Sequence, residues 1–185
     1  MCLTCHQNLR NMEPQKKLSV AETIALLVAS GAKLVQKSGA FMMPVRRGYR
    51  EAVERNRLQK AYLNTTYRVY EPAIAIRIDK ENHGLAATLS QIGHTNWAYL
   101  TAWNPFSKQL TPEENETRNQ QLLDDLKPFR VFNGEGIGDD SSWPPERSFL
   151  VAGIHREVAI YLGKKYKQNA IVVGQGAKAE LVMLK

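Results

Sequence analysis

The stretch WAYLTAWNPFSKQLTPEENETRNQQLLDDLKPFRVF, residues 97–132, decides the fold, because it reads as a strand, a turn, a helix and a second strand. Trp97 to Trp103 is aromatic and β-prone, and Asn104-Pro105 ends it because proline cannot donate to a sheet ladder. Thr111-Pro-Glu-Glu114 supplies an N-cap, a proline at the first helical position and a capping-box glutamate. We therefore predict that a helix follows and that the chain returns to a strand at Phe129–Phe132.

The elements around this stretch extend the pattern. A glycine-rich loop is predicted at Asn133–Gly138, and the further predicted elements are a strand at Ala73–Ile78, a helix at Gly84–Gly93, a strand at Ser148–Ile154, a helix at Arg156–Tyr166, and strands at Ala170–Val173 and Leu181–Leu184. From Trp97 to Val173 the order is β-α-β-β-α-β, which is the split β-α-β, ferredoxin-like arrangement.

This order predicts an α+β domain. We expect a two-layer sandwich with a ferredoxin-like split β-α-β core and extra strands, its helices packed on one face of a mixed sheet. The alternative is a three-layer α/β sheet, because the first strand and helix of the domain can wrap behind the sheet.

The net positive charge of the chain lies in its first 60 residues. Its 185 residues carry a formal net charge of +7, and the first 60 residues alone hold 11 basic and four acidic residues, a balance of +7. We therefore predict a basic, partly helical N-terminal extension at 1–60, with helices at Ser19–Ser30 and Arg47–Leu63, and a single neutral α+β domain at 61–185.

The sequence argues against a membrane-spanning protein, a disulfide-stabilised protein, a zinc-binding protein and a hydrolase with a serine triad. The longest mostly apolar run, Ile24–Ala29, is too short to span a bilayer, and two cysteines cannot build a disulfide framework. Cys2-Leu-Thr-Cys5-His6 has no second pair of zinc ligands, since the chain has no other cysteine. Ser148, Glu146 and His155 form a conceivable hydrolytic set that their spacing does not support. No catalytic residue, metal or cofactor is assigned, and enzymatic activity is left open.

A candidate site starts from two asparagines on the helix after Thr111. Asn115 and Asn119 share one face with the apolar Leu122, so they should be buried. An unmade hydrogen bond of a buried asparagine costs about 1–3 kcal/mol, so polar partners are required. The nearest are in the turn Asn104–Ser107, beside a helix N-terminus that favours anions. Either a ligand pocket or a network that only fixes the turn explains this pattern.

The segment Asn133–Glu146 is the second candidate region. Its carboxylates Glu135 and Glu146 are suited to acid–base chemistry or to a divalent cation, but such acidic loops are more often simply solvated. Trp143 precedes two prolines and is therefore a rigid aromatic side chain, either covering a pocket or filling the core.

A series of motifs resembles one family. They are Ala61-Tyr62 with Thr66-Tyr67, Thr101-Ala-Trp-Asn-Pro-Phe-Ser107, Glu114-Asn115 with Arg118-Asn119 and Leu122, Gly134-Glu-Gly136, Trp143-Pro-Pro-Glu146 with Ser148-Phe-Leu-Val151, and Leu162-Gly163 with Gln168-Asn-Ala-Ile-Val172. In this order they resemble the bacterial domain-of-unknown-function family numbered 3293, over about residues 61–184. Arg147 stands where proline is expected, and Gly174–Ala177 departs from a more acidic turn.

The resemblance implies a compact domain in a bacterial or phage cytoplasm and transfers no activity. From it and the buried-amide argument we expect a small-molecule-binding domain, for a ligand that carries phosphate or resembles a nucleotide. The expected ligand-binding residues are Asn104, Ser107, Asn115, Asn119, Glu135, Trp143, Glu146, Ser148 and Gln168.

Two rival functions remain open. The first is nucleic-acid association through the basic residues Arg46, Arg47, Arg50, Arg55, Arg57 and Lys60. The second is a protein-interaction module, which would carry an exposed apolar patch of several hundred Å².

Overall fold

We describe a computed structural model of the chain over residues 35–37, 40–42, 47–140 and 142–185. The chain divides after Glu51, so the hairpin that precedes it is described by itself. In that hairpin β1 (Val35–Lys37) pairs antiparallel with β2 (Ala40–Met42). The helix expected at Ser19–Ser30 lies outside the described residues.

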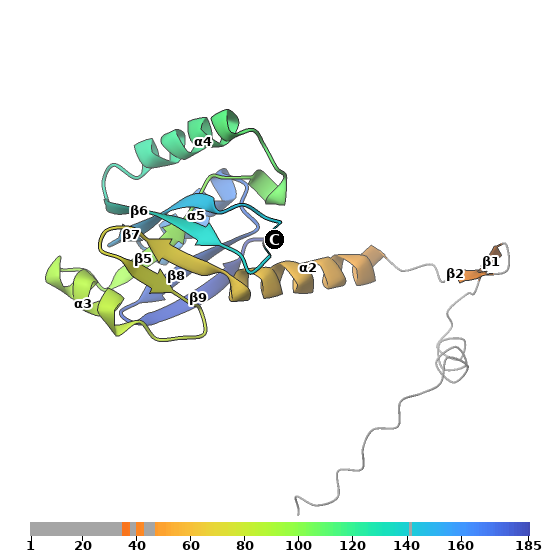
Figure 1. Cartoon of the computed structure of the whole chain (residues 1–185), viewed down its shortest axis with the longest axis horizontal. Coiled ribbons are helices and arrows are strands. Elements are labelled where there is room, and N and C mark those ends of the chain that lie inside the picture. The colour runs from red at the N-terminus through yellow and green to blue at the C-terminus, as the bar shows by residue number, and fades with distance from the viewer. Residues whose placement is uncertain (1–34, 38–39, 43–46, 141) are drawn as a thin grey trace, which may run out of the picture. The chain divides into compact units, whose positions relative to one another are not determined.

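The unit that begins at Ala52 is built around a seven-stranded sheet (Figure 1). Its strands are β3 (Thr66–Val69), β4 (Ile74–Ile76), β5 (Asn96–Leu100), β6 (Arg130–Ile137), β7 (Glu146–Ala152), β8 (Ala170–Gln175) and β9 (Lys178–Met183). The spatial order is β4-β3-β6-β7-β5-β8-β9, and each described pair of neighbours is antiparallel. The expected mixed sheet is therefore wrong. The reason is that β7 inserts between β5 and β6, and β5 inserts between β7 and β8.

The helices confirm the α+β class. They are α2 (Arg47–Asn64), α3 (His83–Gln91), α4 (Pro112–Asp125) and α5 (Arg156–Lys165), with a short 3₁₀ turn η1 at Pro105–Ser107. Helix α4 begins as its sequence predicts, because Thr111 and Glu114 exchange both hydrogen bonds of a capping box. Among the described helices, none is long and apolar enough to cross a membrane.

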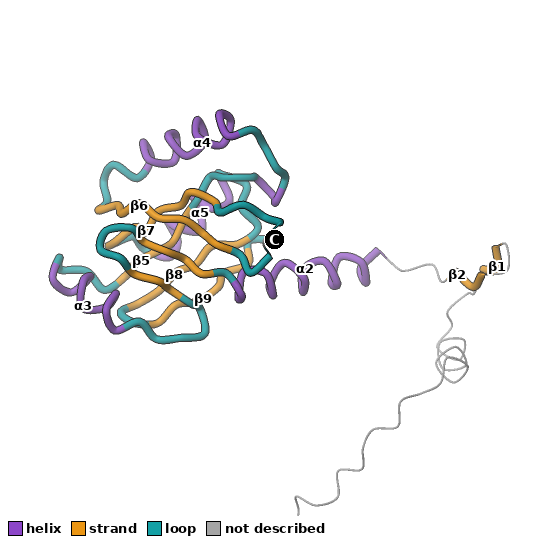
Figure 2. Tube along the Cα trace, viewed as in Figure 1, coloured by secondary structure: helices purple, strands orange, loops and turns teal. Residues whose placement is uncertain are grey.

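Helices cover both faces of the sheet (Figure 2). Successive residues of a strand point to opposite faces, so Ala98 and Leu100 of β5 pack with α4 and α5, whereas Trp97 and Tyr99 pack with α3. The expectation that helices lie on one face only is therefore wrong. Helix α3 buries Leu85 and Leu89 against the second face, as the three-layer alternative anticipated, although the sheet is antiparallel.

A close approach of strands explains Gly134 of β6. Residues 133–137, expected in a loop, belong to this strand, and β3, which had no prediction of its own, pairs with them. The sheet curls enough for the Tyr99 hydroxyl of β5 to donate to the Arg68 carbonyl of β3 at 2.7 Å. A Cβ at Gly134 would collide with both groups of this hydrogen bond. Glycine is thus required here for space, and the segment is a strand despite its composition.

Gly134→Ala should therefore lower the free energy of unfolding by about 1–3 kcal/mol, the usual cost of overpacking. The matched control is Gly136→Ala in the same strand, whose Cβ would meet Thr65 Cγ2 at 3.8 Å and Ser148 Oγ at 3.9 Å, both ordinary contacts. Urea denaturation measures the two values. Equal stability of the two variants would contradict the crossing of Tyr99 over β6.

Candidate functional site

A cavity of about 640 Å³ opens where five strands meet at one end of the sheet. Strands β3, β7 and β8 begin at this end and β5 and β6 finish there, because the sheet is antiparallel. Its polar and aromatic lining includes Tyr62, Tyr67, Tyr99, Thr101, Asn104, Ser107, Asp139, Asp140, Trp143, Glu146, Ser148 and Gln168. The fold thus brings residues from far apart in the sequence to one site.

One face of helix α2 forms a wall of this cavity. Glu54, Leu58 and Ala61, with Arg57 beside them, line it at the spacing i, i+3, i+4 and i+7 of a single helix face. Val53, one residue before Glu54, is 49% exposed and does not line the cavity. Leu58 is half-buried, so the wall borders open space instead of closing onto the sheet.

Glu146 is the central polar group of the cavity. Its Oε1 accepts from Asn104 Nδ2 at 2.7 Å and from Trp143 Nε1 at 3.0 Å. Its Oε2 receives no hydrogen bond from the described residues. Burial raises the pKa of this carboxyl above its ordinary value, although the bonds from Asn104 and Trp143 oppose the shift.

The turn that carries Asn104 is held by side-chain hydrogen bonds. The Asn104 backbone N–H donates to Asn115 Oδ1 at 2.8 Å, and Asn115 Nδ2 donates back to Asn104 Oδ1 at 3.0 Å. Asn104, Phe106 and Ser107 all have left-handed backbone angles, with φ of 44°, 52° and 57°. Such conformations cost of order 1–3 kcal/mol each, so these bonds stabilise a turn that the backbone alone would not adopt.

Asn119 anchors the other side of the same connection. Its Oδ1 accepts from the Ala102 N–H at 2.8 Å, and its Nδ2 donates to the Arg147 carbonyl at 2.9 Å. Among the described residues, no fully buried side-chain nitrogen or oxygen is left without a partner. The buried asparagines therefore fix the turn, and the cavity lies next to the network they form.

The structure brings together six of the nine expected ligand-binding residues. Asn104, Ser107, Trp143, Glu146, Ser148 and Gln168 line the cavity. Asn115 and Asn119 are buried and bonded to the protein, and Glu135 forms an ion pair with Arg68. These three residues do not line the cavity.

Asp139 and Asp140 each interact with a different protein residue. Asp139 lies 3.8 Å from Arg77, whereas Asp140 is bonded to Ser142. No group of three or more histidine, cysteine or acidic side chains in the described part of the chain is arranged to hold a metal ion.

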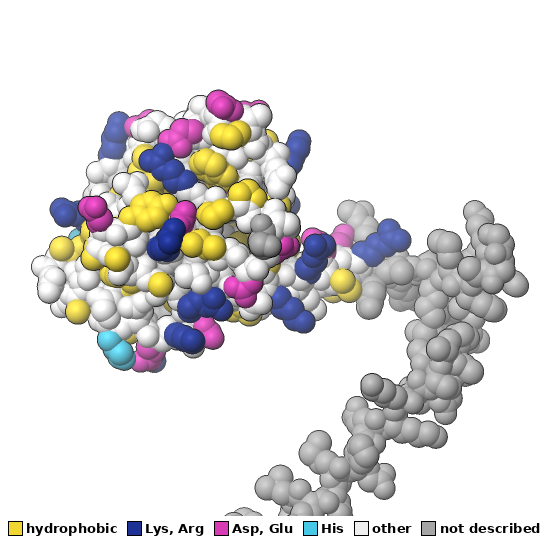
Figure 3. All heavy atoms as spheres, in the orientation of Figure 1, with side chains coloured by type: hydrophobic (Ala, Val, Ile, Leu, Met, Phe, Trp, Pro, Cys, Tyr) yellow, Lys and Arg dark blue, Asp and Glu magenta, His cyan; other side chains and the backbone are white. Residues whose placement is uncertain are grey.

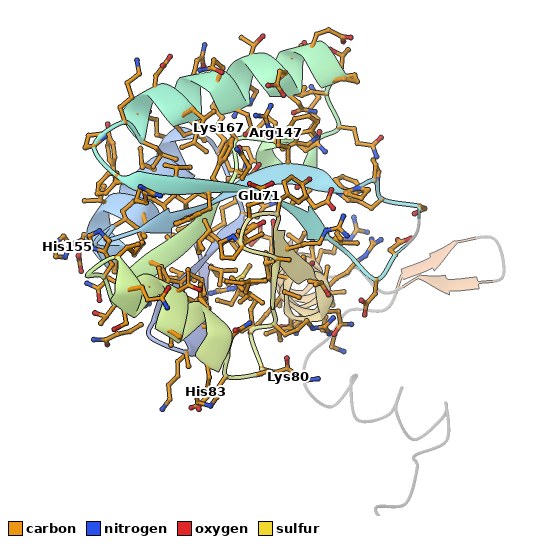
Figure 4. The ribbon with its side chains drawn as sticks, turned by 60° about the vertical axis from the view of Figure 1, so that its left-hand side comes forward. Glu71, Lys80, His83, Arg147, His155 and Lys167 are labelled. Atoms are coloured by element: carbon orange, nitrogen blue, oxygen red, sulfur yellow. The ribbon has the colours of Figure 1, made fainter. Side chains whose placement is uncertain are left out.

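Ser148 and His155 are held apart by a strand. Ser148 lies near the start of β7, next to Arg147, and its hydroxyl donates to the Glu146 carbonyl at 2.8 Å. His155 follows the opposite end of that strand, and Figure 4 shows it well away from Arg147. Ser148, Glu146 and His155 therefore do not come together as a hydrolytic set.

Sequence reasoning missed the tyrosines of the site. Tyr62, Tyr67 and Tyr99 come from α2, β3 and β5, and Tyr99 is far along the chain from the other two, so no local spacing links it to them. The rings of Tyr67 and Tyr99 meet edge to face at 5.4 Å, and the Tyr67 hydroxyl donates to the Tyr62 carbonyl at 3.0 Å. The signal that marks two of them in the sequence is the motif Ala61-Tyr62 with Thr66-Tyr67.

Comparison with known proteins identifies one family. The model described as "Protein of unknown function (DUF3293)" matches residues 100–171. The resemblance is confirmed over this segment. It runs from the end of β5 to the start of β8 and so contains the asparagine network and Glu146. No curated protein and no solved structure matches the chain.

Glu146→Gln should stabilise the protein at neutral pH, because the glutamine side chain can still accept from Asn104 and Trp143 but carries no buried charge. A raised carboxyl pKa means that the folded state binds the proton more tightly than the unfolded state, so wild-type stability falls as pH rises from the ordinary carboxyl pKa through the raised value. The stability difference between variant and wild type should therefore be smallest at about pH 4 and larger at pH 7. Urea denaturation across this range measures it, and a difference independent of pH would contradict the burial of this charge.

Proposed function

We propose that this protein is a small-molecule-binding domain whose site is the cavity at the end of the sheet. The observation that carries the proposal is a cavity of about 640 Å³ in which the half-buried carboxylate of Glu146 has one oxygen that receives no hydrogen bond from the described residues. Ligand sites of 300–1,000 Å³ are typically lined by apolar and aromatic groups with a few fixed polar groups. The tyrosines, Trp143 and Glu146 supply that combination.

A phosphate-bearing ligand receives less support than a ligand without one. The N-terminus of α4 is capped by Thr111 and Glu114, and Glu113 and Glu114 lie in its first turn. The described residues that line the cavity include Glu54, Asp139, Asp140 and Glu146 and a single cationic side chain, that of Arg57. Negative potential at the cavity would oppose an anion.

We also propose that β5-α4-β6-β7-α5-β8 is a ferredoxin-like core. The local strand order β6-β7-β5-β8 supports it, since each β-α-β unit then encloses a strand of the other. The extra helix α3 on the second face is an addition to that core. The bacterial, cytoplasmic setting implied by the family stays a prediction.

Gly136→Leu should abolish ligand binding while the protein stays folded. A Cβ at Gly136 makes ordinary contacts, and a leucine there would extend into the cavity that Gly136 lines. A set of charged and neutral ring compounds, screened by NMR on the full chain, should shift the backbone amides around the cavity. The control is Ala87→Leu on the exposed face of α3, which should leave binding unchanged. Shifts that cluster elsewhere, or that persist in Gly136→Leu, would contradict the site.

Nucleic-acid association is a second candidate, favoured by the exposure of Arg50, Arg55 and Lys60 on α2. Arg57 is also exposed but lines the cavity. The hydrogen bonds from Ser142 lower the pKa of Asp140, and the charge of Arg57 adds to this shift. Arg46 and the side chain of Arg47 lie outside the described part. The protein-interaction hypothesis has less support, because the exposed large apolar side chains come from several elements, and charged residues intervene on the face in Figure 3.

Reversing the three charges, Arg50→Glu with Arg55→Glu and Lys60→Glu, tests the second candidate without removing the helix that lines the cavity. If the helix binds phosphate groups, affinity for a duplex oligonucleotide should fall, and the slope of log affinity against log salt should flatten by about 0.9 for each lost phosphate contact. Fluorescence anisotropy at several salt concentrations measures both. Unchanged binding and slope would eliminate this role for α2.

A further inference from the structure

The cavity presents hydrogen-bond acceptors without protein partners. Glu146 Oε2 receives no hydrogen bond from the described residues, whereas Oε1 receives two. Gln168 Nε2 donates to the Trp103 carbonyl at 2.9 Å, and since a carbonyl only accepts, this bond fixes the amide so that its Oε1 remains an acceptor. Both residues line the cavity. A molecule bound there would therefore be met by oxygens that accept.

Aromatic residues line the same cavity as the carboxylate. Trp143 Nε1 lies 3.0 Å from Glu146 Oε1, so the indole ring is beside it. Tyr62 and Tyr67 line the same cavity as Glu146. A carboxylate among aromatic faces is the combination that attracts organic cations, through charge and through the ring quadrupole.

Charge at the cavity points the same way. Glu54, Asp139 and Asp140 line it together with Glu146, whereas Arg57 is the single cationic side chain among the described lining residues. Asp139 also lies 3.8 Å from Arg77, so the acidic side chains outnumber the cations near the cavity. A cation that displaced water from Glu146 would meet a hydrogen-bond acceptor and a negative field at once, whereas an anion there would meet accepting oxygens and an unfavourable field.

We infer that the ligand of this cavity is a small organic nitrogen cation, an amine, amidine or guanidine, whose N–H donates to Glu146 Oε2. This inference rests on the proposed function and specifies the chemistry of the same site. Asn104 and Trp143 hold the carboxylate in place, and Gln168 Oε1 is the second acceptor for the ligand. The aromatic faces of Tyr62, Tyr67 and Trp143 pack against its apolar part.

The test uses three probes of nearly identical shape and different charge: benzamidine, benzamide and benzoate, with AMP as a nucleotide probe. Each is titrated into the full chain by NMR or calorimetry. We expect benzamidine to bind at least about tenfold more tightly than benzamide, because a charge-assisted hydrogen bond is about twice as strong as a neutral one. Benzoate and AMP should bind more weakly still. This comparison requires no variant.

Two substitutions then locate the interaction. Glu146→Gln keeps an acceptor for Asn104 and Trp143 but replaces Oε2 with an amide, and it should weaken benzamidine by about tenfold or more. Glu157→Gln makes the same change of charge on the exposed side of α5, at a residue that does not line the cavity, and it should change the affinity less than twofold. The melting temperature of each variant confirms that it is folded.

The outcomes separate the two proposals. Equal binding of benzamidine and benzamide, tighter binding of benzoate or AMP, or a Glu146→Gln affinity equal to that of wild type overturns the assignment of a cation while the cavity remains a binding site. If none of the ring compounds or AMP shifts amides around the cavity, the proposed function fails, and the cation assignment fails with it.

Discussion

The hydrogen bond from Asn104 to Glu146 is the interaction on which the rest of the site depends. It joins the connection after β5 to the first residue of β7, and so ties two strands together at the end of the sheet where the cavity opens. Asn104 can donate there because Asn115 and the Leu110 N–H hold its other atoms in a left-handed turn. The network requires a left-handed backbone at Asn104 and removes part of the Glu146 carboxyl from water. It uses only Oε1 of Glu146, so Oε2 stays free of protein hydrogen bonds among the described residues.

The antiparallel strand order places the hydrogen-bond network of Asn104 beside the cavity. Because β3, β7 and β8 start where β5 and β6 end, the residues that flank five strands meet at one end of the sheet. Because the sheet curls, the Tyr99 hydroxyl reaches the Arg68 and Glu135 carbonyls and donates to them. This contact leaves no room for a side chain at Gly134. Helix α2 forms another wall of the cavity. Asn115 and Asn119 bond to the protein and do not line the cavity, whereas Asn104, which they help to position, does.

Much of the secondary structure could be predicted because local signals agreed with the tertiary structure. The capping box at Thr111 set the start of α4, and the aromatic, β-prone composition of Trp97–Trp103 marked β5. Prediction failed at β6, where Gly134 is present because Tyr99 and Arg68 approach, a contact between residues far apart in the sequence. It failed again for the faces of the sheet, because nothing in the sequence of α3 specifies which side of the strands Leu85 and Leu89 cover.

The sequence by itself determined that this is an α+β protein, where most of its helices and strands lie, that Asn115 and Asn119 are buried, and which family segment 100–171 matches. Helical periodicity and capping depend on residues close together in the sequence. The burial of Asn115 and Asn119 could be predicted because they share a helix face with Leu122. Only the tertiary structure decided that Glu146, Trp143, Gln168 and three tyrosines surround one cavity. Strand order and the curl of the sheet set those distances, and they depend on contacts between residues that no spacing along the chain connects.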